Sequence, residues 1–215
     1  MDFFMLGLIL DTSTDRSLIA LSKNHQLIAF SAIPHEQNLS RSLLPSIHQL
    51  LLENEISLKD LFKISVGIGP GSYTGTRIAV AVAESLSLAL AIPLYSFCSL
   101  LAFLPPSLPQ GPFAFVTNTH YSTWFLLKGY FDEGAVTLSC SHHILSKQEM
   151  LPFLDGVPAL LTLPLADLRD HLPEIFSQGT RQLHAETNFS ALIPYLTNLQ
   201  TLSPKKPKIL YLHHF

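Results

Sequence analysis

The segment "VGIGPGSYTGTRIAVAVAESLSLAL", Val66–Leu90, decides the fold of this 215-residue chain. Its first part crowds glycines and a proline between Gly67 and Gly75, and an apolar run follows. A strand, a glycine-rich loop and a helix N-terminus in this order make an anion site or a sharp structural turn, because unpaired amides and the helix dipole favour negative charge. The loop lacks the Gly-Lys-Ser/Thr ending of a P-loop. A structural turn is therefore favoured, and bound phosphate or nucleotide is the alternative.

The helix predicted after the loop, from about Thr74 to Leu90, is apolar around its whole circumference. Its only charged side chains are Arg77 and Glu84. A helix that is apolar all round is buried on more than one side. One side is expected to face a sheet. The other faces either the helix predicted over Asn38–Glu53 or a helix of another chain, and both alternatives are open.

Hydrophobic runs on either side of this segment predict the strands of that sheet. Turns rich in Ser, Thr, Asp and Asn separate strands expected at Phe3–Leu10, at Ser17–Ser22 and up to Ile33. Two more strands, "KISVGIG" and "PLYSF", flank the loop and its helix. Three strands, helix, strand, helix, strand is the order of a ribonuclease-H-like mixed sheet with helices packed on it. The expected fold class is α/β.

The stretch "PPSLPQGP", Pro105–Pro112, is too rich in proline for a helix or a central strand. We place a domain boundary there, between a first lobe over 1–104 and a divergent second lobe over 105–215, whose last residues are open to returning to the first lobe. The second lobe is expected to begin with the strands "FAFVTN" and "STWFLLKGYF". Prolines interrupt the pattern beyond Leu151.

Composition narrows the classes of function. Charged residues make up 13% of the chain and apolar residues 47%, which favours a surface partly covered by a partner. The formal net charge is −3 and no basic face is visible, so unaided nucleic-acid binding is not expected. Cys98 and Cys140 lie far apart, which argues against a disulfide framework or a zinc site. The opening "FFMLGLIL" is too short for a membrane span or a signal peptide, and a cytoplasmic location is expected.

The motifs "LILDTSTDRSLIAL", "LLPSIHQLL" and "VGIGPGSYTGTRIAVAVAESLSLALAIPLYSFCSL" resemble the TsaB (YeaZ) family. The resemblance covers Leu8–Leu101 and implies a two-lobed ASKHA-type fold with mixed sheets flanked by helices. It implies a non-catalytic subunit that binds TsaD, together with the ATPase TsaE. That complex forms the threonylcarbamoyl group on the adenosine next to the anticodon of tRNAs that read ANN codons. The tRNA would be reached only through the complex.

The resemblance implies no cofactor of the chain's own, and it leaves open ATP or ADP at the complex interface and a homodimer in isolation. It also assigns residues to the two candidate sites. The partner interface would comprise Leu43, Ile47, Leu50, Leu51, Tyr73, Arg77, Val80, Ala81, Glu84 and Leu88. The signature loop, a nucleotide contact in the alternative interpretation, would comprise Asp11, Thr12, Ser13, Gly69, Pro70, Gly71, Ser72, Thr74 and Gly75. The family's Asp-Ala-Arg is replaced here by Asn118, Thr119 and His120.

Two enzymatic alternatives compete with the partner subunit. A small-molecule kinase of the same superfold places an acidic residue after the first strand to hold nucleotide, and Asp11 has that position. As a structural residue, Asp11 would instead close the first hairpin through a self-bonded turn. A metal-dependent glycoprotease-like enzyme would need a His-x-x-x-His pair, and the sequence has none. No metal site and no catalytic residue are therefore expected.

Overall fold

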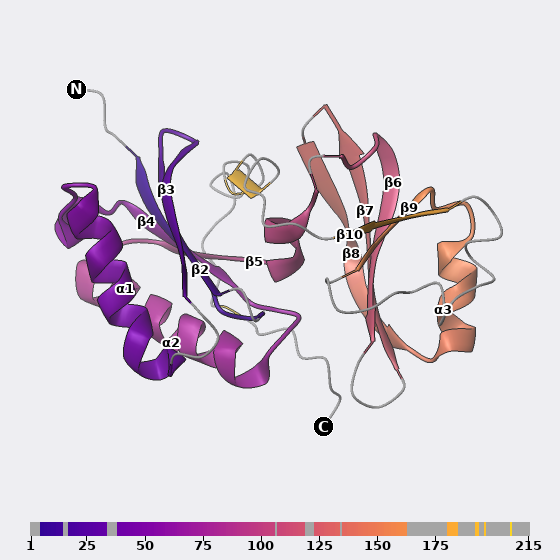
Figure 1. The fold of residues 1–215 in the computed structure, drawn as a ribbon, viewed down its shortest axis with the longest axis horizontal. Helices are drawn as coiled ribbons and strands as arrows, with labels where there is room; N and C mark the ends of the chain where they lie inside the picture. The colour runs from indigo at the N-terminus through magenta and orange to yellow at the C-terminus, as the bar shows by residue number, and fades with distance from the viewer. Residues whose placement is uncertain are drawn as a thin grey trace. The chain divides into compact units, whose positions relative to one another are not determined.

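The structure is a computed structural model (Figure 1). It divides into two compact units, of which unit 1 takes in Met1–Ser99 with Ile193–Tyr211 and unit 2 takes in Leu100–Leu192 with Leu212–Phe215. The residues that the structure describes are 5–14, 17–33, 38–105, 107–118, 123–133, 135–162, 180–184, 192–193, 196 and 207.

Unit 1 contains a five-stranded mixed sheet in the order β3-β2-β1-β4-β5. The first three strands form an antiparallel meander, and β4 and β5 continue the sheet parallel to β1. Leu8 of β1 pairs with Leu21 of β2 and with Ile64 of β4, which places three fully buried side chains in one row across the sheet. The strands are β1 (Leu6–Asp11), β2 (Ser17–Lys23), β3 (Gln26–Ile33), β4 (Lys63–Gly67) and β5 (Leu94–Phe97).

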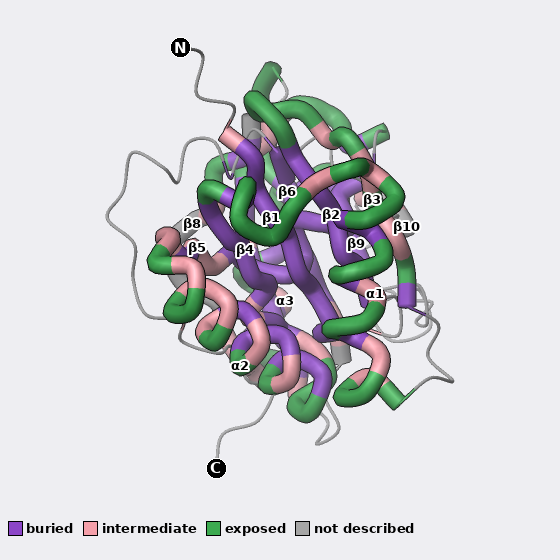
Figure 2. Tube along the Cα trace, turned by 90° about the vertical axis from the view of Figure 1, so that its left-hand side faces the viewer, coloured by how far each residue is buried: buried purple, intermediate pink, exposed green. Residues whose placement is uncertain are grey.

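Two helices, α1 (Leu39–Glu53) and α2 (Tyr73–Leu90), bury one face each in the core of unit 1, together with β1, β2 and β4. Along both helices buried and exposed residues alternate with the helical period (Figure 2). Ser72 caps α2, because its Oγ accepts the backbone N–H of Gly75 at 3.2 Å. Ala91 ends the helix in the left-handed conformation. A short turn, η1 (Leu58–Asp60), follows α1 and leads into β4.

Unit 2 contains a second five-stranded sheet, in the order β10-β9-β6-β7-β8. Its core joins this sheet to α3 (Lys147–Leu154) through side chains such as Trp124, Met150 and Leu160. The Phe113 ring lies against Gly129, directly opposite it in the register of β6 and β7. The strands are β6 (Gly111–Asn118), β7 (Trp124–Asp132), β8 (Ala135–Leu145), β9 (Ala159–Thr162) and β10 (Arg181–His184).

The α/β class with two mixed sheets flanked by helices confirms the expected fold class. Every element predicted before Pro105 is present, with ends within a few residues of those expected, and both strands predicted at the start of the second lobe are present. The change from unit 1 to unit 2 falls between Ser99 and Leu100, inside the turn η2 (Ser99–Phe103), shortly before the prolines at which the boundary was placed.

Candidate functional site

The glycine loop packs against the turn that follows β1. Ser72 N–H donates to the Ser13 carbonyl at 2.5 Å, and Thr12 Oγ1 donates to the Gly75 carbonyl at 2.6 Å. A Cβ added at Gly71 would lie 2.0 Å from the Ser13 carbonyl oxygen, and one at Gly75 would lie 2.0 Å from that of Thr12. Only glycine allows backbone to approach backbone this closely.

The remaining residues of the signature loop fit the same arrangement. Gly69 has φ +93°, a conformation that favours glycine, and it precedes Pro70 through a cis peptide bond. Both residues are buried, whereas Thr74 is exposed. Close contacts with the chain's own backbone therefore account for Gly71 and Gly75 without a ligand. A nucleotide at the complex interface stays a prediction.

Asp11, Thr12 and Ser13 are each 1% exposed. Asp11 Oδ1 accepts the Ser13 N–H at 2.8 Å, which forms the self-bonded turn proposed for this position. Asp11 Oδ2 and Ser13 Oγ are buried and have no hydrogen bond in the described part of the chain. Burial raises the pKa of Asp11, and the nearby hydroxyls of Ser13 and Ser99 and the Ser13 amide offset only part of that effect.

The predicted interface residues of α2 form one stripe along the helix, with a single exception. Tyr73, Arg77, Ala81 and Leu88 are exposed, Leu88 to 85%, and Glu84 is half-buried between them. The guanidinium of Arg77 lies 4.3 Å from the centre of the Tyr73 ring, a cation–π contact that holds both side chains at the start of the helix. The exception is Val80, which belongs to the core.

The interface residues predicted on α1 occupy the opposite face from the one exposed to solvent. Leu43, Ile47, Leu50 and Leu51 are 1–4% exposed and pack in the core of unit 1, so in this structure they have almost no surface to offer a partner. The exposed row is shifted by one residue along the helix. It consists of Leu44, His48 and Leu52, with Leu44 exposed to 52% and Leu52 to 63%.

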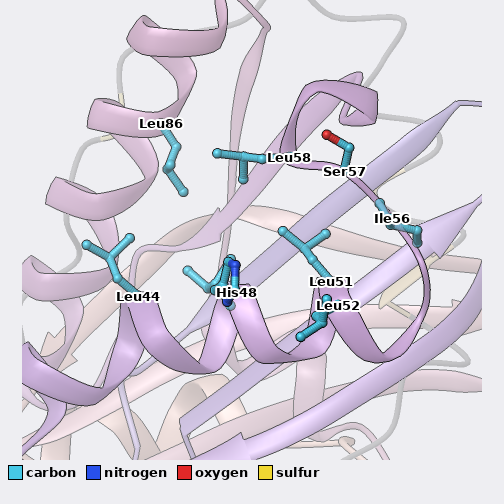
Figure 3. Close-up of a pocket in the computed structure, with 9 residues that line it drawn as sticks. Leu44, His48, Leu51, Leu52, Ile56, Ser57, Leu58 and Leu86 are labelled. Carbon is cyan, nitrogen blue, oxygen red and sulfur yellow. The ribbon is translucent and has the colours of Figure 1, made fainter.

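This exposed row borders an apolar groove of about 340 Å³ (Figure 3). From α1 it is lined by the row Leu44, His48 and Leu52 and by the predicted interface residues Ile47 and Leu51. Leu86 lines it from α2, and Ile56–Leu58 line it on the side of η1. Sequence reasoning missed this row because α1 carries leucines on two adjacent stripes. Which of the two stripes is buried depends on the side of α1 that the sheet covers, and the sequence of the helix does not show that side.

The remaining expectations concern metal ligands, a membrane span, the cysteines and the residues that replace the Asp-Ala-Arg motif. No group of three or more His, Cys, Asp or Glu side chains among the described residues could hold a metal ion. No helix in the described ranges is long and apolar enough to cross a membrane. Cys98 is buried. Asn118 ends β6, whereas Thr119 and His120, which replace the rest of the family's Asp-Ala-Arg, lie outside the described residues.

Comparison with known proteins places this geometry in context. The family model "TsaD: tRNA N6-adenosine threonylcarbamoyltransferase" matches residues 33–115, which include α1, the glycine loop and α2. No curated protein matches the sequence. YeaZ from Pseudomonas aeruginosa superposes with a TM-score of 0.72 at 22% identity, over 93% of this chain and 95% of its own.

A second solved structure, an uncharacterised protein with similarity to peptidase YeaZ from Pseudomonas aeruginosa, gives a TM-score of 0.72 at 20% identity, over 97% of this chain and 100% of its own. At these identities the structures establish a common fold. The match to the family model covers the second and third of the motifs described above, whereas the first motif, at residues 8–21, precedes it. The chain therefore has the fold of YeaZ, and residues 33–115 of it match the TsaD family model.

Proposed function

We propose that the chain is a non-catalytic subunit that binds a TsaD-type transferase and so takes part in threonylcarbamoyl modification of tRNA. The observation that carries the proposal is the exposed apolar layer of α1 and α2, which includes Leu44, Leu52 and Leu88 and borders a groove. Side chains of this kind at the surface of a helical layer are typical of a protein interface. The family model supports the reaction class, since its description names the transferase.

The interface would be built from the α2 stripe, which runs from Tyr73 to Leu88, and from the row Leu44, His48 and Leu52 of α1. Tyr73 and Arg77 would supply an aromatic and a guanidinium group, the side chains most often found at interface hot spots. Binding would act by stabilising the competent conformation of the transferase, as any ligand selective for one state does. TsaE would join the same complex, the tRNA would contact it indirectly, and the complex would work in the cytoplasm.

The kinase alternative receives less support from the site. It needs Asp11 and the glycine loop to face a nucleotide, whereas Asp11 is 1% exposed and the loop packs on Thr12 and Ser13. The proposal therefore includes no nucleotide bound by the chain alone and no turnover of its own.

The test is size-exclusion chromatography with light scattering on the chain alone and mixed with the TsaD of the same organism, with ATP hydrolysis assayed on the same fractions. A stoichiometric complex without hydrolysis by the chain alone is the expected result. Ala81→Arg and Leu88→Asp should each abolish the complex while the fold is retained, because both side chains are exposed. Val80→Glu is unsuitable for this purpose, since Val80 is a core residue and its replacement would unfold the chain.

Tyr130→Asp provides the matched control. Tyr130 is 53% exposed on β7, a strand of unit 2, so this variant introduces the same charge as Leu88→Asp at an exposed aromatic position that belongs to neither α1 nor α2. A complex that survives both α2 substitutions would refute the interface. The absence of any complex, together with substrate-stimulated ATP turnover by the chain alone, would refute the partner role and favour the kinase.

A further inference from the structure

The carboxyl group of Asp11 lies where the ends of β1 and β4 meet the glycine loop. A Cβ added at Gly67, the last residue of β4, would be 2.0 Å from Asp11 Oδ2 and 2.7 Å from Ser99 Oγ. The carboxyl and the hydroxyl therefore share the space over the Cα of Gly67. Ser99 is in turn fastened to the loop, because its Oγ accepts the Gly69 N–H at 2.9 Å and its N–H donates to the Gly69 carbonyl at 2.8 Å.

The hydrogen bonds around this carboxyl group do not suit a carboxylate ion. A carboxylate can only accept hydrogen bonds, and a buried one is stable when two or three donors or a cation face it. Asp11 Oδ1 has one backbone donor, the Ser13 N–H, and Oδ2 makes no hydrogen bond in the described part of the chain. The neighbouring Ser13 and Ser99 hydroxyls lower the pKa of Asp11, but by less than burial raises it. Ser13 Oγ is also buried without a partner.

Among the residues that the structure describes, the groups that face Asp11 carry no charge that would hold an ion there. They are Ser13 from its own turn, Gly67 from β4 and Ser99 from η2, and none of them is ionisable at ordinary pH. The ionisable residue of β4 is Lys63, at the opposite end of that strand. A neutral carboxylic acid, by contrast, supplies an O–H donor to a neighbouring hydroxyl oxygen. Burial accordingly raises the pKa of Asp11.

We propose that the Asp11 carboxyl, buried over Gly67 with Oδ2 unbonded in the described part of the chain, is a neutral acid, and that its proton locks the glycine loop and the start of α2 onto the ends of β1 and β4. Ionisation would leave an unpaired buried charge beneath the loop. Such a charge would also destabilise the start of α2, because the turn after Asp11 is hydrogen-bonded to it: the Ser13 carbonyl accepts the Ser72 N–H, and Thr12 Oγ1 donates to the Gly75 carbonyl. Asp11 is thus a positioning residue for the helix.

One consequence rests on the proposed function. Tyr73 and Arg77 begin the exposed stripe of α2 directly after the loop that Asp11 holds in place, so partner binding would weaken as the pH rises. The contact between Asp11 and the glycine loop is a property of the isolated chain and is tested without any partner. Failure of the test therefore says nothing against the partner role.

The experiment compares thermal unfolding of the wild-type chain and of Asp11→Asn between pH 4 and pH 9, together with a carbon-13 NMR titration of the Asp11 carboxyl. A group whose folded pKa is raised contributes stability that is complete below its unfolded pKa, about 3.9, and is lost as the pH rises toward the folded value. Within that window the folding equilibrium constant of the wild type should fall by up to about tenfold per pH unit relative to Asp11→Asn.

Asparagine does not titrate, keeps an oxygen for the Ser13 N–H and places an N–H₂ donor toward Ser99. The control is Asp60→Asn, since Asp60 is an exposed acidic residue of η1 that accepts the Ser57 N–H at 2.9 Å and takes no part in the contact between Asp11 and the glycine loop. Asp11→Asn should lose the extra alkaline destabilisation and Asp60→Asn should keep it. Equal pH slopes for the wild type and Asp11→Asn would overturn the proposal. So would an NMR titration of the Asp11 carboxyl below pH 4, a readout that remains available if the variant fails to fold.

Discussion

Replacement of Gly75 by alanine separates the two interpretations of the glycine loop. The added Cβ would lie 2.0 Å from the Thr12 carbonyl oxygen, far inside the 3.4 Å at which ordinary contact begins, and the obstacle is backbone rather than a flexible side chain. The loop and the turn must therefore separate. Had Gly75 served only to let a ligand approach, alanine would stabilise the unliganded helix by about 1 kcal/mol through its higher helix propensity.

The expected loss follows from the contacts that the separation breaks. The bonds at risk are Thr12 Oγ1 to the Gly75 carbonyl, Ser72 N–H to the Ser13 carbonyl and Gly75 N–H to the Ser72 cap. At about 1 kcal/mol each they amount to about 3 kcal/mol, from which the propensity gain of about 1 kcal/mol is subtracted. Gly75→Ala should lower the free energy of unfolding by about 2 kcal/mol and the Tm by about 4–8 °C.

Thermal unfolding followed by far-ultraviolet circular dichroism measures this change, while the fluorescence of Trp124, the chain's single tryptophan, reports on unit 2. Ser72→Ala is the comparison variant, because it removes the cap without a collision and should cost about 1 kcal/mol. A Gly75→Ala chain as stable as the wild type, or more stable, would refute the packing argument and restore the ligand-binding interpretation of the loop.

Two further predictions concern packing. Leu51→Ala should lower the free energy of unfolding by about 2–5 kcal/mol, because Leu51 is 3% exposed. Leu52→Ala, at the adjacent and 63% exposed position, should change it by less than about 0.5 kcal/mol. Equal effects of the two substitutions in urea denaturation would contradict the face of α1 that the structure places in the core. Gly129→Ala should lower the free energy of unfolding by about 1–3 kcal/mol, because the new Cβ would lie 2.4 Å from the buried Phe113 ring. Denaturant unfolding followed by Trp124 fluorescence should then have its midpoint at a lower denaturant concentration. An unchanged midpoint would contradict that contact.

Much of the architecture could be predicted from the sequence, because local patterns encode it directly. The turn residues between short apolar runs located β1, β2 and β3, and the three-to-four spacing of leucines located α1 within one residue of its ends. The motif after β4 indicated both the loop and the helix that follows. After the first two strands of the second lobe the pattern is weak, and prolines interrupt it beyond Leu151, so β8, α3, β9 and β10 were not predicted.

The candidate site was less predictable, because both helices are apolar on more than one face. The residues predicted on α2 form an exposed or half-buried stripe except for Val80, which packs in the core beside the exposed Ala81. The residues predicted on α1 are buried, and the exposed row of Leu44, His48 and Leu52 was not among them. A shift of one residue turns a helical side chain by about 100°, which is enough to exchange core for surface.

The sequence by itself determined the order of strands and helices, the sharp loop before α2 and the excess of apolar helical surface. Each of these depends on residues close together in the chain. Only the tertiary structure decided which leucines the sheet covers, that Thr12 and Ser13 occupy the space left by Gly71 and Gly75, and that the carboxyl of Asp11 is buried over Gly67. The physical reason is that these contacts join segments about sixty residues apart, and no local preference specifies such a meeting until the sheet brings β1 beside β4.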